Sequence, residues 1–150
     1  MDGTGGIQNF CNTIAGVWTN KQQAQSDPTG YVWSYIQWDL LGDSRLKSKQ
    51  WYKNDGKIYR ERCFNAYEDD RGNVILDIHK LDWTPIGHSL KWQPVKSGEW
   101  YLSGDYVYEG TDVFYEGRLT KNNYFSWDRG FKNGKLTYGS TKGAFKFDRL

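Results

Sequence analysis

Long apolar runs are missing from this sequence of 150 residues. No stretch approaches the roughly 18 residues that a membrane-spanning helix needs, and residues 1–3 do not begin the basic and apolar segments of a signal peptide. We therefore expect a cytoplasmic, soluble protein with no membrane partner. The length predicts a single domain over residues 1–150.

An excess of charge and an abundance of cysteine are missing too. Twenty Lys and Arg against 18 Asp and Glu give a net charge of +2, and the basic residues form no cluster, which argues against a nucleic-acid partner. The two cysteines, Cys11 and Cys63, have no metal-ligand spacing and are expected as free thiols in a reducing compartment. We expect no structural metal.

Catalytic signatures are missing as well. There is no glycine-rich phosphate loop before a helix and no nucleophile elbow. His79 and His88 lack any partner spacing, so we expect each at the surface or in a loop. The residues alone leave the catalytic residues unknown.

Aromatic residues, by contrast, are abundant: 8 Trp, 11 Tyr and 7 Phe make up 17% of the chain. Such side chains suit the lining of a ligand pocket as well as a core, because they offer large apolar area with polar tips. Composition alone leaves open an aromatic-lined barrel for another ligand, such as a carbohydrate.

The hydrophobic pattern predicts an all-β fold with one N-terminal helix. Apolar residues recur at helical spacing from about residue 6 to 18. After Asp27-Pro28, aromatic and β-branched segments alternate with turn signals, of which Asn133-Gly134 is the strongest for a hairpin. The expected strands are 31–38, 46–53, 57–67, 74–81, 99–103, 105–108, 112–119, 123–129, 135–140 and 144–149, with a loose stretch at 85–96. Nine or ten strands in sequence predict a closed antiparallel meander barrel, because closure removes exposed edges.

Two arginines in the segment Tyr59-Arg60-Glu61-Arg62 are candidate binding residues. On a strand, Arg60 and Arg62 face the same way, with Cα atoms roughly 6.6 Å apart, so two guanidinium groups could hold two carboxylates. A solvated strand face is the alternative. Asp128, at the end of an aromatic strand, could lie inside the barrel, or it could have a structural role by pairing with an arginine or capping the turn at Phe131.

An ordered set of short motifs resembles the T-type phycobiliprotein lyases, the CpcT/CpeT family. The matching segments run from about residue 16 to the C-terminus and are Asn20, Gln23-Ala24, Asp27-Pro28, Tyr31, Gln50-Trp51-Tyr52, Tyr59 to Arg62, Asp128-Arg129-Gly130, Tyr138-Gly139-Ser140 and Gly143-Ala144-Phe145-Lys146-Phe147. Tyr138 stands where the family tends to have Trp, Ala144 replaces Pro, and the segment from about 82 to 100 is short. The short chain resembles the versions that cyanophages carry.

The resemblance implies a lipocalin-like calyx that binds an open-chain tetrapyrrole (a phycobilin) and delivers it to a cysteine of a phycobiliprotein β-subunit. The CpeT side of the family implies phycoerythrobilin as that phycobilin. The resemblance also implies that Arg60 and Arg62 clamp the two propionates and that Asp128 accepts the pyrrole N–H groups. Aromatic residues would flank the chromophore, namely Tyr59, Tyr138, Trp33 and Tyr35. It further implies a homodimer. A bilin carrier without transfer activity is the alternative, because the retained motifs are those of the pocket.

Overall fold

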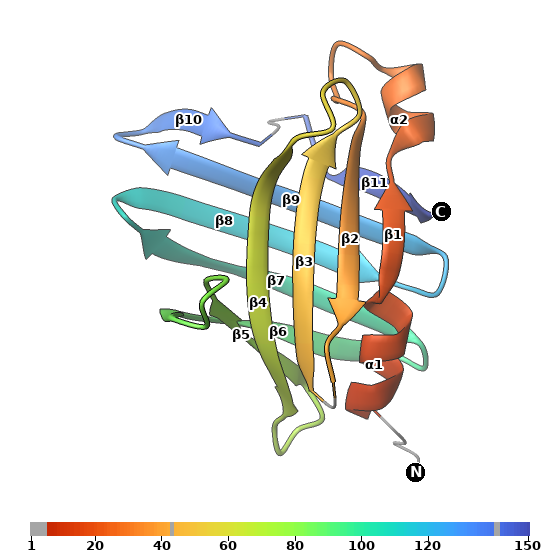
Figure 1. Cartoon of the computed structure of the whole chain (residues 1–150), viewed down its shortest axis with the longest axis vertical. Helices are drawn as coiled ribbons and strands as arrows, with labels where there is room; N and C mark the ends of the chain where they lie inside the picture. Colours follow the sequence, from red (N-terminus) through yellow and green to blue (C-terminus); the bar gives the residue numbers. More distant parts are fainter. Residues whose placement is uncertain (1–5, 43, 140–141) are drawn as a thin grey trace.

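The computed structural model describes residues 6–42, 44–139 and 142–150, and it shows a curved antiparallel sheet closed into a barrel (Figure 1). The helices are α1 (Gly6–Ile14) and α2 (Lys21–Ser26). The strands are β1 (Gly16–Thr19), β2 (Ser34–Leu40), β3 (Arg45–Tyr52), β4 (Ile58–Glu68), β5 (Val74–His79), β6 (Pro85–Lys96), β7 (Glu99–Tyr108), β8 (Thr111–Leu119), β9 (Asn123–Lys132), β10 (Lys135–Tyr138) and β11 (Phe145–Arg149).

Strand β9 closes the barrel. From β1 to β9 each strand pairs antiparallel with the next, and β11 pairs with both β1 and β9. The free edge of β9 is shared, because its first half pairs with β11 and its second half with the short strand β10. The result is a closed barrel of ten strands with one extra strand, β10, and the predicted all-β, lipocalin-like calyx is confirmed.

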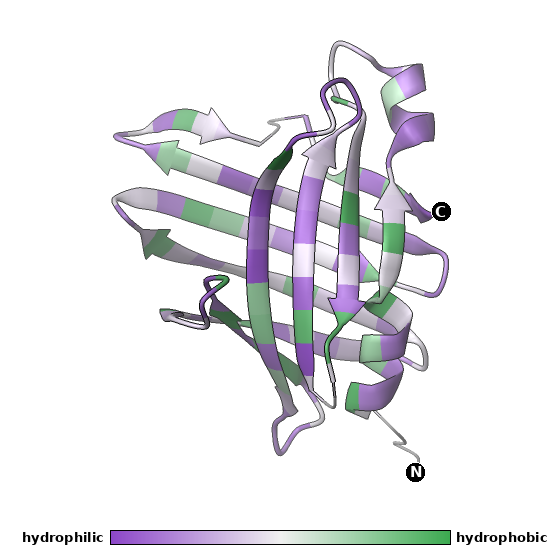
Figure 2. Ribbon diagram, in the orientation of Figure 1, coloured by the Kyte–Doolittle hydropathy of each residue, from purple (hydrophilic) through white to green (hydrophobic). Residues whose placement is uncertain are grey.

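Alternation along the strands separates the inside of the barrel from the outside. In β8, Val113, Tyr115, Gly117 and Leu119 are buried, while the residues between them are exposed. Figure 2 shows the same alternation of hydropathy along neighbouring strands. This period of two is what a half-buried strand requires.

Helix α1 covers one end of the barrel, at the lower right of Figure 1. Its buried residues include Phe10, whose ring lies 5.5 Å from those of Trp92 and Trp100. The helix ends at Ile14 rather than near residue 18 as the periodicity predicted. Gly16 has a φ of 130°, and the next residues form β1, whose backbone groups pair with both β2 and β11. The backbone hydrogen bonds of β1 to its two neighbouring strands therefore determine the conformation of this segment, although the helical spacing of apolar residues continues through it.

Two motif positions hold the N-terminal segment to the barrel. The Asn20 side chain donates to the carbonyl of Val32 (2.9 Å) and accepts from the amide of Ser34 (2.8 Å). The Gln23 side chain donates to the carbonyl of Ala144 and accepts from the amide of Lys146, both at 3.0 Å. These two polar side chains therefore have structural partners in the barrel.

The largest error in the predicted strands concerns residues 85–96. This stretch, predicted as loose, is the twelve-residue strand β6. Its two prolines stand at the first residue and at a register shift near the β7 pairing, positions that a strand tolerates. The predicted strands 99–103 and 105–108 are one strand, β7, and α2 and β1 were not predicted. Asp43 and Ser140, parts of predicted turn and strand signals, lie outside the described residues.

Within residues 6–42, 44–139 and 142–150, no helix has the length and apolar character needed to cross a membrane. Over the same ranges, no three His, Cys, Asp or Glu side chains gather as a metal site would require.

Candidate functional site

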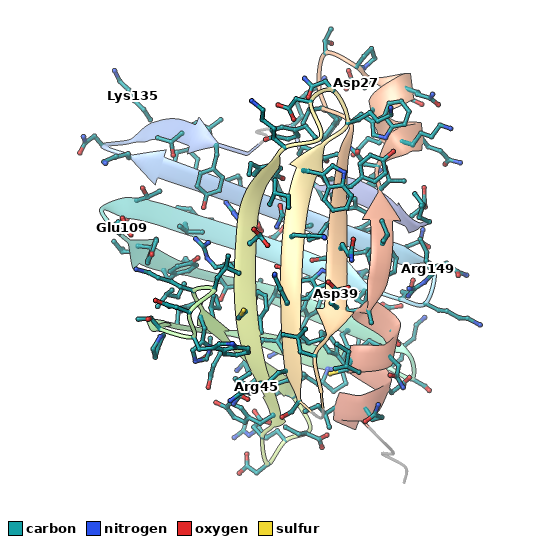
Figure 3. All side chains as sticks on the ribbon, viewed as in Figure 1. Asp27, Asp39, Arg45, Glu109, Lys135 and Arg149 are labelled. Carbon is teal, nitrogen blue, oxygen red and sulfur yellow. The ribbon has the colours of Figure 1, made fainter. Side chains whose placement is uncertain are left out.

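A cavity of about 390 Å³ lies inside the barrel. Its inner end lies toward α1, where it is lined by Trp92, a ring contact of Phe10. Its other end reaches the β7–β8 and β9–β10 turns, where Glu109 and Lys132 line it. In Figure 3, Glu109 and Lys135 mark these turns on the left, away from α1. The volume lies within the range of small-molecule sites.

Arg60 and Arg62 both line this cavity, from neighbouring inward positions of β4. They face Ser48 and Gln50 across the β3–β4 ladder, and those two side chains also line the cavity. The inward direction predicted for the two arginines as one strand face is therefore observed. Their role in binding a chromophore stays a prediction.

The two arginines differ in what they contact. Arg60 Nη1 lies 3.5 Å from Asp128 Oδ2, and its guanidinium lies 5.1 Å from the centre of the Tyr138 ring. Arg62 Nη1 donates to the main-chain carbonyl of Glu61 at 2.8 Å. Within the described part of the chain Arg62 has no carboxylate partner, so its guanidinium is available to an anionic ligand.

Asp128 lies in the barrel wall opposite the arginines. It comes from β9, and 36% of its side chain is accessible, on the side of the cavity that it lines. Burial among protein atoms raises the pKa of the Asp128 carboxyl, and Arg60 and Arg129 oppose that effect by favouring the charged form. Burial disfavours the charged form of this carboxyl, so a ligand that donates hydrogen bonds to the carboxylate stabilises that form.

Tyr138 reaches the cavity because two glycines make room for it. A Cβ on Gly130, its cross-strand partner, would overlap the Tyr138 ring. Gly139 has a φ of 94°, and a Cβ there would overlap the main-chain carbonyl of Asp128. The glycines of the Asp128-Arg129-Gly130 and Tyr138-Gly139 motifs therefore allow β10 to lay an aromatic ring over Arg60.

Tyr59 sits beside the cavity rather than in its wall. It is the extra residue of a β-bulge, since Gln50 pairs with Arg60 while Trp51 pairs with Ile58. The bulge cancels the strict alternation that would turn Tyr59 fully outward. Its hydroxyl donates to Gln50 Oε1 at 2.8 Å, and its ring stacks on Tyr52 at 4.4 Å. Tyr59 thus supports a cavity-lining side chain from the rim.

Trp33 and Tyr35 do not line the cavity, contrary to the prediction. The inward residues of this segment are Ser34, Ile36 and Trp38, so both aromatics lie on the outer face. Tyr35 stacks on Trp51 with centroids 5.3 Å apart. Trp33 donates from Nε1 to Thr19 Oγ1 at 3.1 Å. Aromatic content does not show which of the alternating residues of a strand face inward. The prediction therefore chose the residues that face outward.

A cluster of side chains around His88 was not predicted from the sequence. This residue lies on β6, half-buried, with its ring stacked on Tyr106 at 4.2 Å and Nε2 2.7 Å from the hydroxyl of Tyr115. Both tyrosines line the cavity. Burial lowers the pKa of His88, an effect that Asp105 partly opposes, and burial raises the pKa of Tyr115 to about 12. Alternation in β6, β7 and β8 was the signal that could have found this cluster.

The arrangement joins an aromatic cavity to a few charged groups at one side. Within the described residues Arg62 has no carboxylate partner, Arg60 is paired with Asp128, and burial raises the pKa values of the Tyr106, Tyr115 and Tyr138 phenols, which stay available as hydrogen-bond donors. Such a lining suits a flat conjugated molecule that carries both acidic groups and N–H donors.

Comparison with known proteins gives a match in structure alone. No protein-family model matches the chain, and neither does any curated protein sequence. The structure of the T-type phycobiliprotein lyase CpeT from Prochlorococcus phage P-HM1 superposes with a TM-score of 0.78 at 20% identity, covering 96% of this chain and 97% of that one. The CRL protein of Arabidopsis superposes with a TM-score of 0.73 at 17% identity, with the same coverage of both chains. The chain therefore has the fold of these proteins, and the predicted structural resemblance to a T-type phycobiliprotein lyase is confirmed.

Proposed function

We propose that this barrel binds an open-chain tetrapyrrole in its cavity and delivers it to a cysteine of a phycobiliprotein β-subunit. The observation that carries the proposal is the placement of Arg62, free of any described carboxylate, beside the Arg60–Asp128 pair in an aromatic cavity. The fold shared with a T-type phycobiliprotein lyase supports the same ligand class.

The two propionates of a bilin fit the two arginines. Arg62 lines the cavity, and none of the described carboxylates pairs with its guanidinium. Arg60 and Asp128 are held at 3.5 Å, a loose ion pair that a propionate can open. A planar, permanently charged fork suits carboxylate binding. We therefore assign the propionate clamp to Arg60 and Arg62.

The pyrrole N–H groups of the bilin fit Asp128. An ionised carboxylate accepts several hydrogen bonds at once, and among the described residues only Arg60 donates to the partly accessible Asp128 carboxyl. Hydrogen bonds from the pyrroles would favour its charged form and lower its raised pKa. Tyr138, over Arg60, is placed to flank the conjugated system.

The transfer step needs no nucleophile on this chain. In the proposed reaction the acceptor's thiol S–H and the ring-A ethylidene C=C are broken, a C–S bond forms at the exocyclic carbon, and a proton adds to the ring carbon. Cys11 and Cys63 are 2% and 3% exposed, and burial raises the pKa of each. Neither lines the cavity, so this chain would position the bilin for the acceptor's thiol.

Two experiments test the proposal in order. Titration with phycoerythrobilin, the proposed ligand, should give a saturable change in its visible absorption spectrum. Mixing the loaded protein with an apo phycobiliprotein β-subunit should then give a coloured adduct that survives denaturation. Binding without the adduct would favour a bilin carrier, whereas no binding would refute the function altogether.

The assembly is a separate part of the proposal. We expect a homodimer that works in the same cytoplasmic compartment as its acceptor. Light scattering on the purified protein with and without bilin tests the dimer, and a mass of one chain in both states would contradict it.

A further inference from the structure

The first part of β4 has a strand beside it on one side only. β4 pairs with β3 from Asn65 back to Ile58, whereas its pairing with β5 begins at Cys63, opposite His79. β5 ends at His79, and within the described chain no backbone hydrogen bond from the β5–β6 turn reaches residues 58–62. In Figure 1 the upper part of β4 continues beyond the β5–β6 turn. Residues 58–62 therefore present a free strand edge in the barrel wall.

This free edge borders an open hollow at the gap in the barrel wall. The hollow is lined by residues 58–62, by residues 80–82 of the β5–β6 turn and by Tyr108 at the end of β7. Three large side chains of its lining are strongly exposed: Ile58 (46%), Tyr59 (47%) and Leu81 (49%). Exposed apolar groups that gather around a hollow are typical of a surface that binds another protein.

The hollow adjoins the ligand cavity, because Arg60, Arg62 and Tyr108 line both of them. The two arginines are the proposed propionate clamp, so a bilin held by them lies next to any group that enters the hollow. Helix α1 closes the far end of the barrel, where Phe10 and Ile14 are 0% exposed. The hollow is therefore a route by which the acceptor's thiol can reach the bound bilin.

A free strand edge is suited to binding an extended polypeptide. Its unpaired N–H and C=O groups form a ladder with the backbone of an added strand, and the side chains beside the edge select that strand. Tyr59 is the extra residue of the bulge, which limits the regular part of the edge to residues 60–62. Such a short ladder suits a partner that binds and then leaves.

We propose that residues 60–62 of β4, with the apolar rim formed by Ile58 and Leu81, are the docking site for the acceptor, which adds an extended segment next to its cysteine to this edge. The inference rests on the proposed function, since it names the surface that the phycobiliprotein β-subunit contacts. The thiol enters between the free edge and the β5–β6 turn and meets the bilin beside Arg60 and Arg62. A second copy of this chain is the competing occupant of the edge.

Amide hydrogen exchange followed by NMR tests the added strand. The bilin-loaded ¹⁵N-labelled protein is measured alone and with an apo β-subunit whose acceptor cysteine is replaced by serine, so that the bilin is not transferred. Successive amides of a strand point to opposite sides, so part of residues 60–62 donates to β3 and the rest points to the free edge.

We expect the free-edge amides to exchange rapidly in the loaded protein alone. They should exchange roughly tenfold more slowly when the subunit occupies about nine-tenths of the protein, because only the unbound fraction exchanges. Residues 63–65, which pair with both β3 and β5, are the matched control and should keep their rates.

Leu81→Ala tests the rim. Leu81 and Leu41 are 49% and 50% exposed, but Leu41 lies between β2 and β3, outside the hollow. Leu81→Ala should raise the β-subunit concentration at the half-maximal rate of adduct formation roughly 3- to 12-fold, because about half of this leucine remains to be buried. Leu41→Ala should leave it unchanged. Neither variant should change the maximal rate or the bilin titration, since neither side chain lines the ligand cavity.

The outcomes separate the docking site from the proposed function. Unchanged exchange at residues 60–62 beside normal adduct formation overturns the docking site and leaves the function standing. Slow exchange of all three amides in the loaded protein alone, as when a second copy covers the edge, also overturns it. Equal losses in Leu81→Ala and Leu41→Ala exclude the rim. Without an absorption change on bilin titration the proposed function fails, and the docking site falls with it.

Discussion

Replacing Arg62 with alanine is the cleanest test of the propionate clamp. Arg62 has no described carboxylate partner, so its removal leaves no buried acid uncompensated. Removing Arg60 would instead strand Asp128, whose pKa burial already raises. A charge-assisted hydrogen bond to a propionate is worth about 1.5 to 3 kcal/mol, so Arg62→Ala should raise the dissociation constant of phycoerythrobilin roughly 10- to 150-fold.

The assay is an absorption titration at fixed pH and salt, with urea unfolding as a check on the fold. Arg118→Ala is the matched control, because it removes the same charge from the outer face, where Arg118 pairs with Glu99 at 3.1 Å. The dimethyl ester of the bilin closes a double-mutant cycle, since Arg62→Ala should not weaken its binding. Equal affinities of the unaltered protein and Arg62→Ala for the free diacid would refute the clamp.

Three further predictions follow from the site. Binding should weaken as pH falls through the raised pKa of Asp128, because the pyrrole N–H groups need its carboxylate form as acceptor. Asp128→Asn should abolish this pH dependence and shift the absorption band of the bound bilin. An unaltered spectrum would mean that the carboxylate has a structural role only. Gly139→Ala should lower the free energy of unfolding by about 1 to 3 kcal/mol, measured in urea, because of its positive φ and the overlap with the Asp128 carbonyl; an unchanged midpoint would refute the close approach of β10. His88 should titrate below its ordinary pKa of 6.5 by NMR, so the stability it contributes is present above that pH and is lost as pH falls; titration at or above 6.5 would contradict its burial.

The barrel and its arginine face could be predicted from the sequence because they depend on local patterns. Alternation placed Arg60 and Arg62 on one face, and closely spaced turn signals predicted a meander. Asn133 and Gly134 both have positive φ, as the hairpin between β9 and β10 requires. These features depend on residues near each other in the chain.

The errors arose where distant pairing or strand parity decides. Val17 and Trp18 continue the helical period, yet β1 is fixed by ladders to β2 and β11. Trp33 and Tyr35 were wrongly predicted to face the inside of the barrel. Pairing with the neighbouring strands of the sheet determines which residues of a strand face inward, and the local sequence does not show it. His88 was missed because its partner Tyr115 lies 27 positions away and β6 was not predicted as a strand.

A substitution that fills the cavity is the most direct test of whether the bilin binds there. Ser126 lines the cavity from β9, so Ser126→Trp should occupy the space without altering the outer face. If the cavity is the bilin site, phycoerythrobilin should give a saturable absorption change with the unaltered protein and none with Ser126→Trp, while far-ultraviolet circular dichroism shows that both proteins are folded. An identical titration in the two folded proteins would contradict the claim that the barrel cavity is the bilin site.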